Sequence, residues 1–378
     1  MRIGTVTYNL AQRRPSETAL RELVQGAGAA ELFIVAVQEH SDFLEAMRCR
    51  STPQYTDNFA HILSALDAAL RSSARRIATV EHGAQGLAIY HQTSSRTDIS
   101  LLSTNKVSTG PYLTSSKGGV GVLLRIHASD GEPTTLAVVG AHLAAGMENV
   151  GRRNAHFRDM VSRLALAGMS LLHADAAVFL GDLNYRSMDG KLANDQLRRE
   201  MEANRVLPAF AESAIAFGPT YRLVVGEKRL YDNLRTPAWC DRALVYVRSP
   251  AADVAVRRWW AGELSADSER KDSKGLVEAE CPVDWRRYEA LEVCGSDHRP
   301  VVAEFDLHLP VAARLSAMSG DLPHMVDPHW PLWLSLGEAT GCLAGEAYHL
   351  AANPLPRTVC LSLFAAAAAY YIYSSKPQ

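Results

Sequence analysis

The sequence predicts an α/β or α+β domain built of stacked layers. Short runs of apolar or alternating residues, each bounded by turn or polar residues, are typical of strands. A helical pattern lies between two of these runs, and strands mixed with helices indicate a layered arrangement. A chain of 378 residues is long enough for one large domain with an appendage.

The strand pattern recurs along most of the chain. The predicted strands cover residues 3–8, 32–37, 86–90, 120–126, 136–140, 176–180, 243–247 and 300–305. A helix is predicted over 149–172, where Met160, Val161, Leu164 and Leu166 recur at helical spacing on an otherwise Arg-rich surface. No internal repeat interrupts this order.

Composition changes at two places. Residues 262–280 are rich in Glu, Asp, Lys and Ser and are expected to form an exposed excursion within the domain. The strand pattern stops after residue 309, which predicts a layered domain over 1–308 and an irregular linker over 309–355. The remaining residues, 356–378, form a hydrophobic C-terminal tail.

The tail contains an almost unbroken apolar run over 359–373. As a helix this run would extend for about 22 Å, whereas the hydrocarbon core of a bilayer is about 30 Å thick. Tyrosines near its end and Lys376 beyond it resemble the residues that flank a membrane interface. Two expectations remain open: a membrane-associated tail, or a helix packed on the main domain.

Charge and cysteine usage restrict the function. Lys and Arg number 39 against 41 for Asp and Glu, so a protein that coats nucleic acid by bulk electrostatics is not expected. The six cysteines show no CxxC spacing, which indicates neither a zinc site nor a disulfide framework. No secretory signal pattern opens the sequence, so a cytoplasmic location is expected.

Polar residues follow several of the predicted strands. In VFLGDLNYR, Asp182 and Asn184 are two positions apart, a spacing that places side chains on one face of an extended chain. Taken alone, this pair is equally compatible with a site and with a turn cap. Asp297 and His298 precede the last strand and offer an oxygen ligand and a phosphate-binding imidazole, although a polar loop is the alternative.

Other strands repeat this pattern. Glu39 follows the strand 32–37, Asn9 follows the first strand, and His142 follows the strand 136–140. Ligand sites gather at the ends of sheet strands, and the repetition makes coincidence improbable. The sequence therefore predicts one cleft that collects these side chains, with a Mg²⁺ ligand at Glu39.

The segments VFLGDLNYR and RTPAWCDRALVY resemble the two signature stretches of inositol polyphosphate 5-phosphatases, within the endonuclease/exonuclease/phosphatase superfamily. Three further segments are similar to that family: GAHLAAGMENVGRRNAHFRDM, TNKVSTGPYLTSSKGGVGVLLRI and FGPTYR. The segments follow one another in the family's order, and the resemblance covers 1–308. It implies a four-layer α/β/β/α sandwich that acts as the catalytic domain.

The resemblance also implies a reaction. The expected activity is the Mg²⁺-dependent hydrolysis of the 5-phosphate of phosphoinositides, soluble inositol polyphosphates or both. Glu39 would be the principal Mg²⁺ ligand, with Asn9 and Asp297 completing the site directly or through water. Asp182 would orient and deprotonate the attacking water, and Asn184 would hold that water or a phosphate oxygen.

The family's remaining roles also transfer to named positions. His298, held by Asp241, would donate to the phosphoryl group, and His142 would contact the same group. Arg242 would bind substrate by adding positive charge nearby. The residues expected to bind the rest of the substrate are Tyr221, Arg222 and Arg235, at a phosphate on the neighbouring inositol carbon, and Lys117, at the phosphate nearer the glycerol link.

Some positions depart from the family's pattern. The family usually has Lys where Asn233 stands, Asn where Ser116 stands and often His where Gly146 stands, and the loop between Tyr221 and Arg235 is shorter. These changes are expected to alter substrate preference more than chemistry.

Three alternatives remain: a nuclease acting on a DNA backbone, a sphingomyelin-cleaving enzyme, and a catalytically silent phosphoinositide-binding module. The WCDR and PTYR segments argue against the first two. The presence of every residue expected to do chemistry argues against the third. The expected partners are therefore an inositol phosphate or phosphoinositide and, through the tail, a membrane surface, with no nucleic acid.

Overall fold

The computed structural model describes residues 1–25, 30–41, 53–127, 132–263, 283–308, 322–332 and 335–336. The predicted excursion at 262–280 lies almost wholly outside the described residues, and the tail at 356–378 lies wholly outside them. Among the described residues, no helix combines the length and apolarity needed to cross a membrane.

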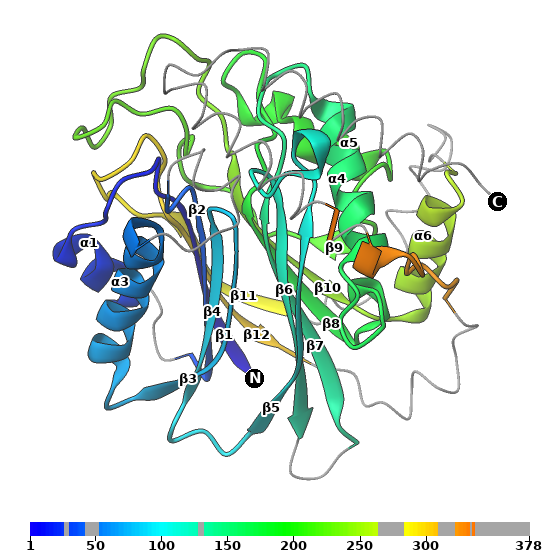
Figure 1. The fold of residues 1–378 in the computed structure, drawn as a ribbon. Helices are drawn as coiled ribbons and strands as arrows, with labels where there is room; N and C mark the ends of the chain where they lie inside the picture. The colour runs from blue at the N-terminus through cyan, green and yellow to red at the C-terminus, as the bar shows by residue number, and fades with distance from the viewer. Residues whose placement is uncertain are drawn as a thin grey trace, which may run out of the picture.

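Two six-stranded mixed sheets face each other (Figure 1). The strand order of the first sheet is β11-β12-β1-β2-β4-β3, with bounds Val283–Ala290, Val301–Leu307, Arg2–Asn9, Leu32–Gln38, Gln85–Gln92 and Ala74–His82. The strand order of the second is β5-β6-β7-β8-β10-β9, with bounds Asp98–Ser108, Gly118–His127, Thr134–His142, Ala176–Asp182, Asp241–Val247 and Phe210–Ala211.

Helices cover the outer faces of both sheets (Figure 1). The first sheet is covered by α1 (Glu17–Gln25) and α3 (Pro53–Leu70). The second is covered by α4 (Val150–Arg163), α5 (Gln196–Glu202) and α6 (Pro250–Trp260). The predicted four-layer α/β/β/α sandwich is therefore confirmed.

Three apolar clusters fill the spaces between the layers. Ile34 and Leu87 of the first sheet meet Val120 and Val178 of the second in the central cluster. The other two clusters lie between each sheet and its own helices. Buried apolar side chains are the main source of stability in such a fold, and here they fix the alignment of the two sheets.

All eight predicted strands are present, and β3, β5, β9 and β11 add to them. The predicted helix over 149–172 is too long, because α4 ends at Arg163. Ala167 and Gly168 have positive φ values of 50° and 80°, which a helix cannot contain. Leu164 and Leu166 lie beyond the end of α4 but are both buried in the core. The apolar pattern of the helix therefore continues past the residue at which the helix ends.

Part of the predicted linker packs on the domain. Leu322 and Met325 are buried in the cluster between the second sheet and its helices. The backbone N–H of Asp327 also donates to the carbonyl of Ser162, at the end of α4, over 2.7 Å. Residues 322–327 therefore contribute to the core of the layered domain.

Candidate active site

A cleft of about 360 Å³ opens at the end of the sandwich where β1, β2 and β8 finish. It is lined by Ala11, Gln12, Glu39, Lys117, Ala145, Asp182, Asn184, Arg186, Tyr221, Arg222, Arg235, Asp297 and His298. Both sheets contribute to this lining, so the cleft exists only where the two sheets meet.

Strand register aligns part of the site. On the second sheet, Asp182 at the end of β8 pairs with His142 at the end of β7 and with Asp241 at the start of β10. On the first sheet, Asn9 ends β1 and its partner Gln38 ends β2, one residue before Glu39. Parallel and antiparallel pairing together bring these strand ends to one edge of each sheet.

The backbone around Asp182 requires particular residues. Gly181 has a φ of 148°, and a Cβ there would lie 1.9 Å from the carbonyl oxygen of Ala141 on β7. Only glycine permits this approach between the strands. Asn184 has a φ of 56°, a conformation that asparagine tolerates better than most residues.

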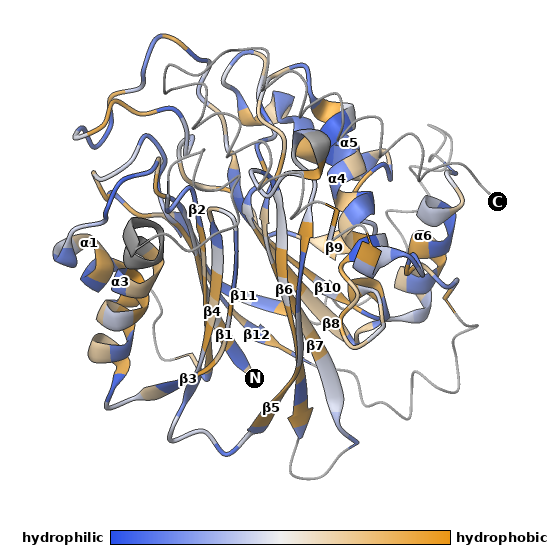
Figure 2. Ribbon diagram, in the orientation of Figure 1, coloured by the Kyte–Doolittle hydropathy of each residue, from blue (hydrophilic) through white to orange (hydrophobic). Residues whose placement is uncertain are grey.

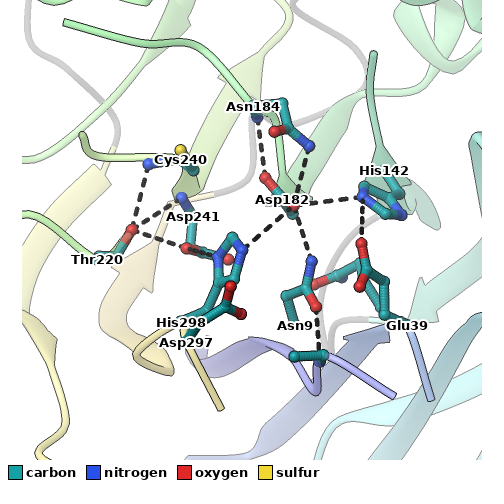
Figure 3. A network of polar contacts seen from close by, with 12 residues as sticks. Asn9, Glu39, His142, Asp182, Asn184, Thr220, Cys240, Asp241, Asp297 and His298 are labelled. Carbon is teal, nitrogen blue, oxygen red and sulfur yellow. Dashed lines mark hydrogen bonds and ion pairs between the residues drawn. The ribbon is translucent and has the colours of Figure 1, made fainter. Parts of the chain in front are cut away.

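Asp182 is at the centre of a network of polar contacts (Figure 3). Its Oδ2 accepts hydrogen bonds from Nδ2 of Asn9 and Nδ2 of Asn184, both over 2.9 Å. Its Oδ1 accepts from the backbone N–H of Asn184 over 3.0 Å. Burial alone would raise the pKa of Asp182, but the charge of His298, a hydrogen bond from His142 and the nearby Lys117 hold that pKa well below its usual range.

His298 lies between two carboxylates. Its Nδ1 is 2.8 Å from Oδ2 of Asp241, and its Nε2 is 4.0 Å from Oδ2 of Asp182. Thr220 donates from its hydroxyl to Oδ2 of Asp241 over 2.7 Å and so helps to fix that carboxylate. Burial alone would lower the pKa of His298, but Asp241 and Asp182 raise it to about 9. His298 is therefore an imidazolium at neutral pH.

Glu39 lies on the opposite side of Asp182 (Figure 3). Its Oε1 is 3.6 Å from Nε2 of His142 and 3.9 Å from Nζ of Lys117. Burial alone would raise the pKa of Glu39, but the neighbouring His142 and Lys117 lower it, so the carboxylate is ionised. Its φ of 51° is uncommon for a residue other than glycine or asparagine, and such backbone strain gathers at functional sites.

The chemistry of the donors fits a divalent cation bound by oxygen. The carboxylates of Glu39 and Asp297 both line the cleft, and hard cations such as Mg²⁺ take oxygen ligands. A second grouping, of Asp182, Asp241 and His298, has ligand atoms within 4.8 Å of one another. Because His298 is protonated, that grouping is better described as an ion-paired triad than as a metal centre.

The sequence profile of endonuclease/exonuclease/phosphatase family 2 matches residues 6–304. The chain belongs to this family. One curated relative of this chain is the type II inositol 1,4,5-trisphosphate 5-phosphatase of Mus musculus, which is 27% identical over 81% of the chain. Synaptojanin-2 of Rattus norvegicus is 30% identical over 50% of the chain. These alignments cover 29% and 13% of the two relatives, so the chain spans under a third of their length.

Solved structures share the family's fold. The inositol polyphosphate 5-phosphatase domain of SPsynaptojanin, in complex with inositol (1,4)-bisphosphate and calcium ion, matches with a TM-score of 0.61 at 21% identity. That alignment covers 93% of each chain. A Cimex nitrophorin matches with a TM-score of 0.54 at 16% identity, over 82% of this chain and 99% of its own. At these identities the likeness concerns the fold.

The structure brings nearly all of the predicted site residues together. The cleft is lined by Glu39, Lys117, Asp182, Asn184, Tyr221, Arg222, Arg235, Asp297 and His298. Asn9, His142 and Asp241 are buried and contact these lining residues from behind. Arg222 also approaches Asp297, with Nε 3.3 Å from Oδ2.

Arg242 is the exception, and its prediction as a substrate-binding residue is wrong. Its side chain has no exposed surface and forms ion pairs with Asp195, over 2.9 Å, and with Glu212. Successive side chains on a strand point to opposite faces, and Asp241 takes the face that carries the site. Arg242 therefore points into the protein and holds the surrounding loops.

Four lining residues were not predicted from the sequence: Ala11, Gln12, Ala145 and Arg186, of which Arg186 alone is charged. Its side chain is 8% exposed, lines the cleft and donates to Oδ1 of Asn184. Its guanidinium also lies over the ring of Tyr221, 4.2 Å from the centroid. The signal was present in VFLGDLNYR, where Arg186 lies two residues after Asn184.

The positions that depart from the family's pattern lie at the edge of the site. Ser116 is buried and hydrogen-bonded to the hydroxyl of Thr114 over 2.9 Å. Asn233 is exposed and is not among the described residues that line the cleft. Gly146 has a φ of 100°, which a side chain would strain. None of the three contacts the Asp182 network.

Proposed function

We propose that this protein is a Mg²⁺-dependent phosphatase that hydrolyses the 5-phosphate of phosphoinositides, soluble inositol polyphosphates or both. The observation that carries the proposal is that Glu39, Asp182 and His298 line one cleft, although they are distant in sequence. The name of the mouse relative, an inositol 1,4,5-trisphosphate 5-phosphatase, supports this substrate class. The calcium ion and inositol bisphosphate of the SPsynaptojanin complex support a cation and a phosphorylated inositol in such a cleft.

Asp182 would position the attacking water. Its pKa is held low, so it remains an anion and accepts a hydrogen bond from the water. A carboxylate of such low basicity is better suited to orientation, with proton transfer late in the reaction, than to early proton removal. The bond from the water oxygen to phosphorus forms while the bond from phosphorus to the inositol oxygen breaks. The water would lose a proton to Asp182 late in the step, and the inositol oxygen would take up a proton from solvent, which yields phosphate and an inositol hydroxyl.

His298 and the cleft cations would stabilise the phosphoryl oxygens. The negative charge of the transition state spreads over these oxygens, and fixed positive groups lower its free energy. Asp241 orients His298 through the 2.8 Å contact between them, and its charge raises the pKa of His298 to about 9, which keeps the imidazole protonated. Arg186 and Lys117 add positive charge at the lining of the cleft.

Glu39 and Asp297 would hold Mg²⁺, with Asn9 contributing directly or through water. A bound Mg²⁺ neutralises phosphoryl charge and orients the substrate. The carboxamide of Asn9 already donates to Asp182, so Asn9 would also couple the cation site to the water-positioning residue.

Phosphate release tests the proposal. The purified protein is incubated with a panel of inositol phosphates and phosphoinositides, with Mg²⁺ or with EDTA, beside an abasic DNA duplex. We expect Mg²⁺-dependent release from substrates that carry a 5-phosphate and none from Asp182→Asn. Cleavage of the DNA alone would replace the proposal with a nuclease, and absence of any turnover would favour a binding module.

The C-terminal tail is part of the proposal but not of the described structure. Its apolar run supports association with a membrane, from a cytoplasmic location. Deleting residues 356–378 and fractionating cells tests this. A shortened protein that still pellets with membranes to the same extent would contradict a role for the tail.

A further inference from the structure

Exposed apolar side chains are concentrated beside the cleft. Of the large apolar side chains on the described surface, four lie in one short segment: Val224, Val225, Leu230 and Leu234. Met188, which is 70% exposed, follows the cleft residue Arg186 by two positions. Exposed apolar groups in a cluster need an explanation, whereas scattered ones do not.

The segment is a hairpin with a defined tip. We call residues 221–232 the rim hairpin. Leu223 pairs with Tyr231, and the backbone N–H of Val224 donates to the carbonyl of Leu230 over 2.8 Å. A tight turn joins the two sides of the hairpin. In this turn the N–H of Glu227 donates to the carbonyl of Val224, and Gly226 has a φ of 94°. Gly226 at this position is the usual choice for such a turn.

The base of the rim hairpin is fixed to the domain. Leu223 is buried, and its N–H donates to the carbonyl of Asp297 over 2.9 Å. The hydroxyl of Tyr231 donates to the carbonyl of Pro219 over 2.9 Å, and Arg229 pairs with Glu292. These contacts fix the position of the apolar tip, which remains exposed to solvent.

The rim hairpin continues directly from the cleft. Tyr221 and Arg222 line the cleft at its start, and Arg235 lines it just beyond its end. The hairpin projects at the upper left of Figure 1, from the same end of the sandwich as the cleft, and Figure 2 shows apolar stretches along it. The rim hairpin therefore lies next to the cleft in the sequence and at the same end of the sandwich.

The charge of the rim hairpin adds to this pattern. Lys228 is exposed at the tip beside Glu227, and Arg229 is exposed but ion-paired with Glu292. Arg222 lies towards the cleft, as does Arg235 just beyond the hairpin. Apolar side chains with adjacent Lys and Arg are the combination that binds the interface of an anionic bilayer.

We propose that the rim hairpin docks on a lipid bilayer that contains anionic headgroups. Val225 and Leu230 enter the interface while Lys228 meets the headgroups, which brings the cleft mouth against the membrane. The choice of lipid as the occupant rests on the proposed function, because a phosphoinositide is held in a bilayer and must be reached there. A second copy of the chain is the competing occupant.

The test is a matched pair of double variants of the full chain. Val225→Glu/Leu230→Glu places charge at the tip, and Leu101→Glu/Val254→Glu makes the same changes at exposed sites on β5 and α6. Each protein is sedimented with vesicles of phosphatidylcholine, with or without phosphatidylserine. Turnover is measured on a vesicle-embedded phosphoinositide and on a soluble inositol polyphosphate.

We expect the hairpin variant to bind phosphatidylserine vesicles about tenfold more weakly, because charge replaces two apolar side chains at the interface. Its turnover on vesicles should fall in proportion, and its turnover on soluble substrate should stay unchanged. The control variant should match the wild-type protein throughout. Vesicle binding needs no catalysis, so this result stands even if the proposed phosphatase activity fails.

Two outcomes overturn the inference. The first is equal vesicle binding and vesicle turnover by the two variants. The second is a wild-type dimer in solution that the hairpin variant alone loses, measured by sedimentation velocity, because the tip would then pair with a second copy.

Discussion

Asp182 separates two halves of the cleft that hold their charge differently. In one half, His298 is in contact with Asp241 at 2.8 Å and is protonated through the charge of its carboxylate neighbours. In the other half, Glu39 meets His142 and Lys117 only at 3.6 and 3.9 Å, and its side chain is 34% exposed. The protein completes the first half with its own groups, and it leaves in the second a carboxylate suited to an added cation.

The first prediction removes the residue that both halves share. Asp182→Asn should lower kcat by about 10⁴-fold, because the water loses its anionic partner and His298 loses a neighbouring carboxylate. Phosphate release under saturating Mg²⁺ measures the effect, and circular dichroism checks that the fold is kept. Turnover within tenfold of wild type would remove Asp182 from the mechanism.

The second prediction breaks the preorganised half. Asp241→Asn should reduce kcat by about 10³-fold, since His298 loses the carboxylate that orients and charges it. In the metal-free protein, the pKa of His298 should fall from about 9 towards its ordinary value of 6.5. Nitrogen NMR of labelled histidine reads that pKa directly.

The same pair predicts a dependence of stability on pH. Because folding raises the pKa of His298, its contribution to stability is complete below about pH 6.5. That contribution is lost as the pH rises towards 9. Urea unfolding of the metal-free protein between pH 6 and 10 should show the decline, and Asp241→Asn should show less of it. A pKa of His298 that is unchanged in the variant would argue against the pair.

The third prediction breaks the half left for a cation. Glu39→Gln keeps the size of the side chain and removes its charge, so activity at low Mg²⁺ should fall about 10²-fold. Higher Mg²⁺ should restore part of this loss, which it cannot do for Asp241→Asn. Titration of Mg²⁺ against initial rate separates the two variants, and equal Mg²⁺ dependence would contradict the assignment of Glu39.

The fourth and smallest effect concerns Arg186. Arg186→Lys keeps the charge but loses the planar contacts with Asn184 and Tyr221, so kcat/KM should fall about tenfold. A change in KM alone would indicate substrate binding, and a change in kcat alone would indicate positioning of Asn184. An unaffected variant would make Arg186 a structural residue.

The sequence predicted the site best where the backbone conformation permits only one or two residue types. Gly181 and Asn184 take backbone conformations that few residues tolerate, and these constraints made GDLN recognisable. Arg242 adjoins Asp241 in the WCDR segment but is buried in ion pairs outside the site. The alternation of a strand would have separated Asp241, in the site, from Arg242, in the core.

Other features depend on contacts that a single sequence does not reveal. The end of α4 at Arg163 could not be predicted from the apolar pattern, because Leu164 and Leu166 continue that pattern beyond it. Tertiary packing of these two residues determines where the helix ends. The burial of Leu322 and Met325 also depends on a surface assembled from distant segments. The apolar tip of the rim hairpin could be identified only once its place beside the cleft was known.

Hydrogen bonds join the two sheets at the site, from Asn9 on β1 to Asp182 on β8, and from His298, ahead of β12, to Asp241 on β10. Turnover therefore measures how well the two halves of the sandwich are aligned. A small shift of one sheet along the other would lengthen these hydrogen bonds and abolish the proposed activity, while every strand kept its own pairing. In a denaturant titration, we therefore expect the activity to be lost at a lower denaturant concentration than the circular dichroism signal of the strands.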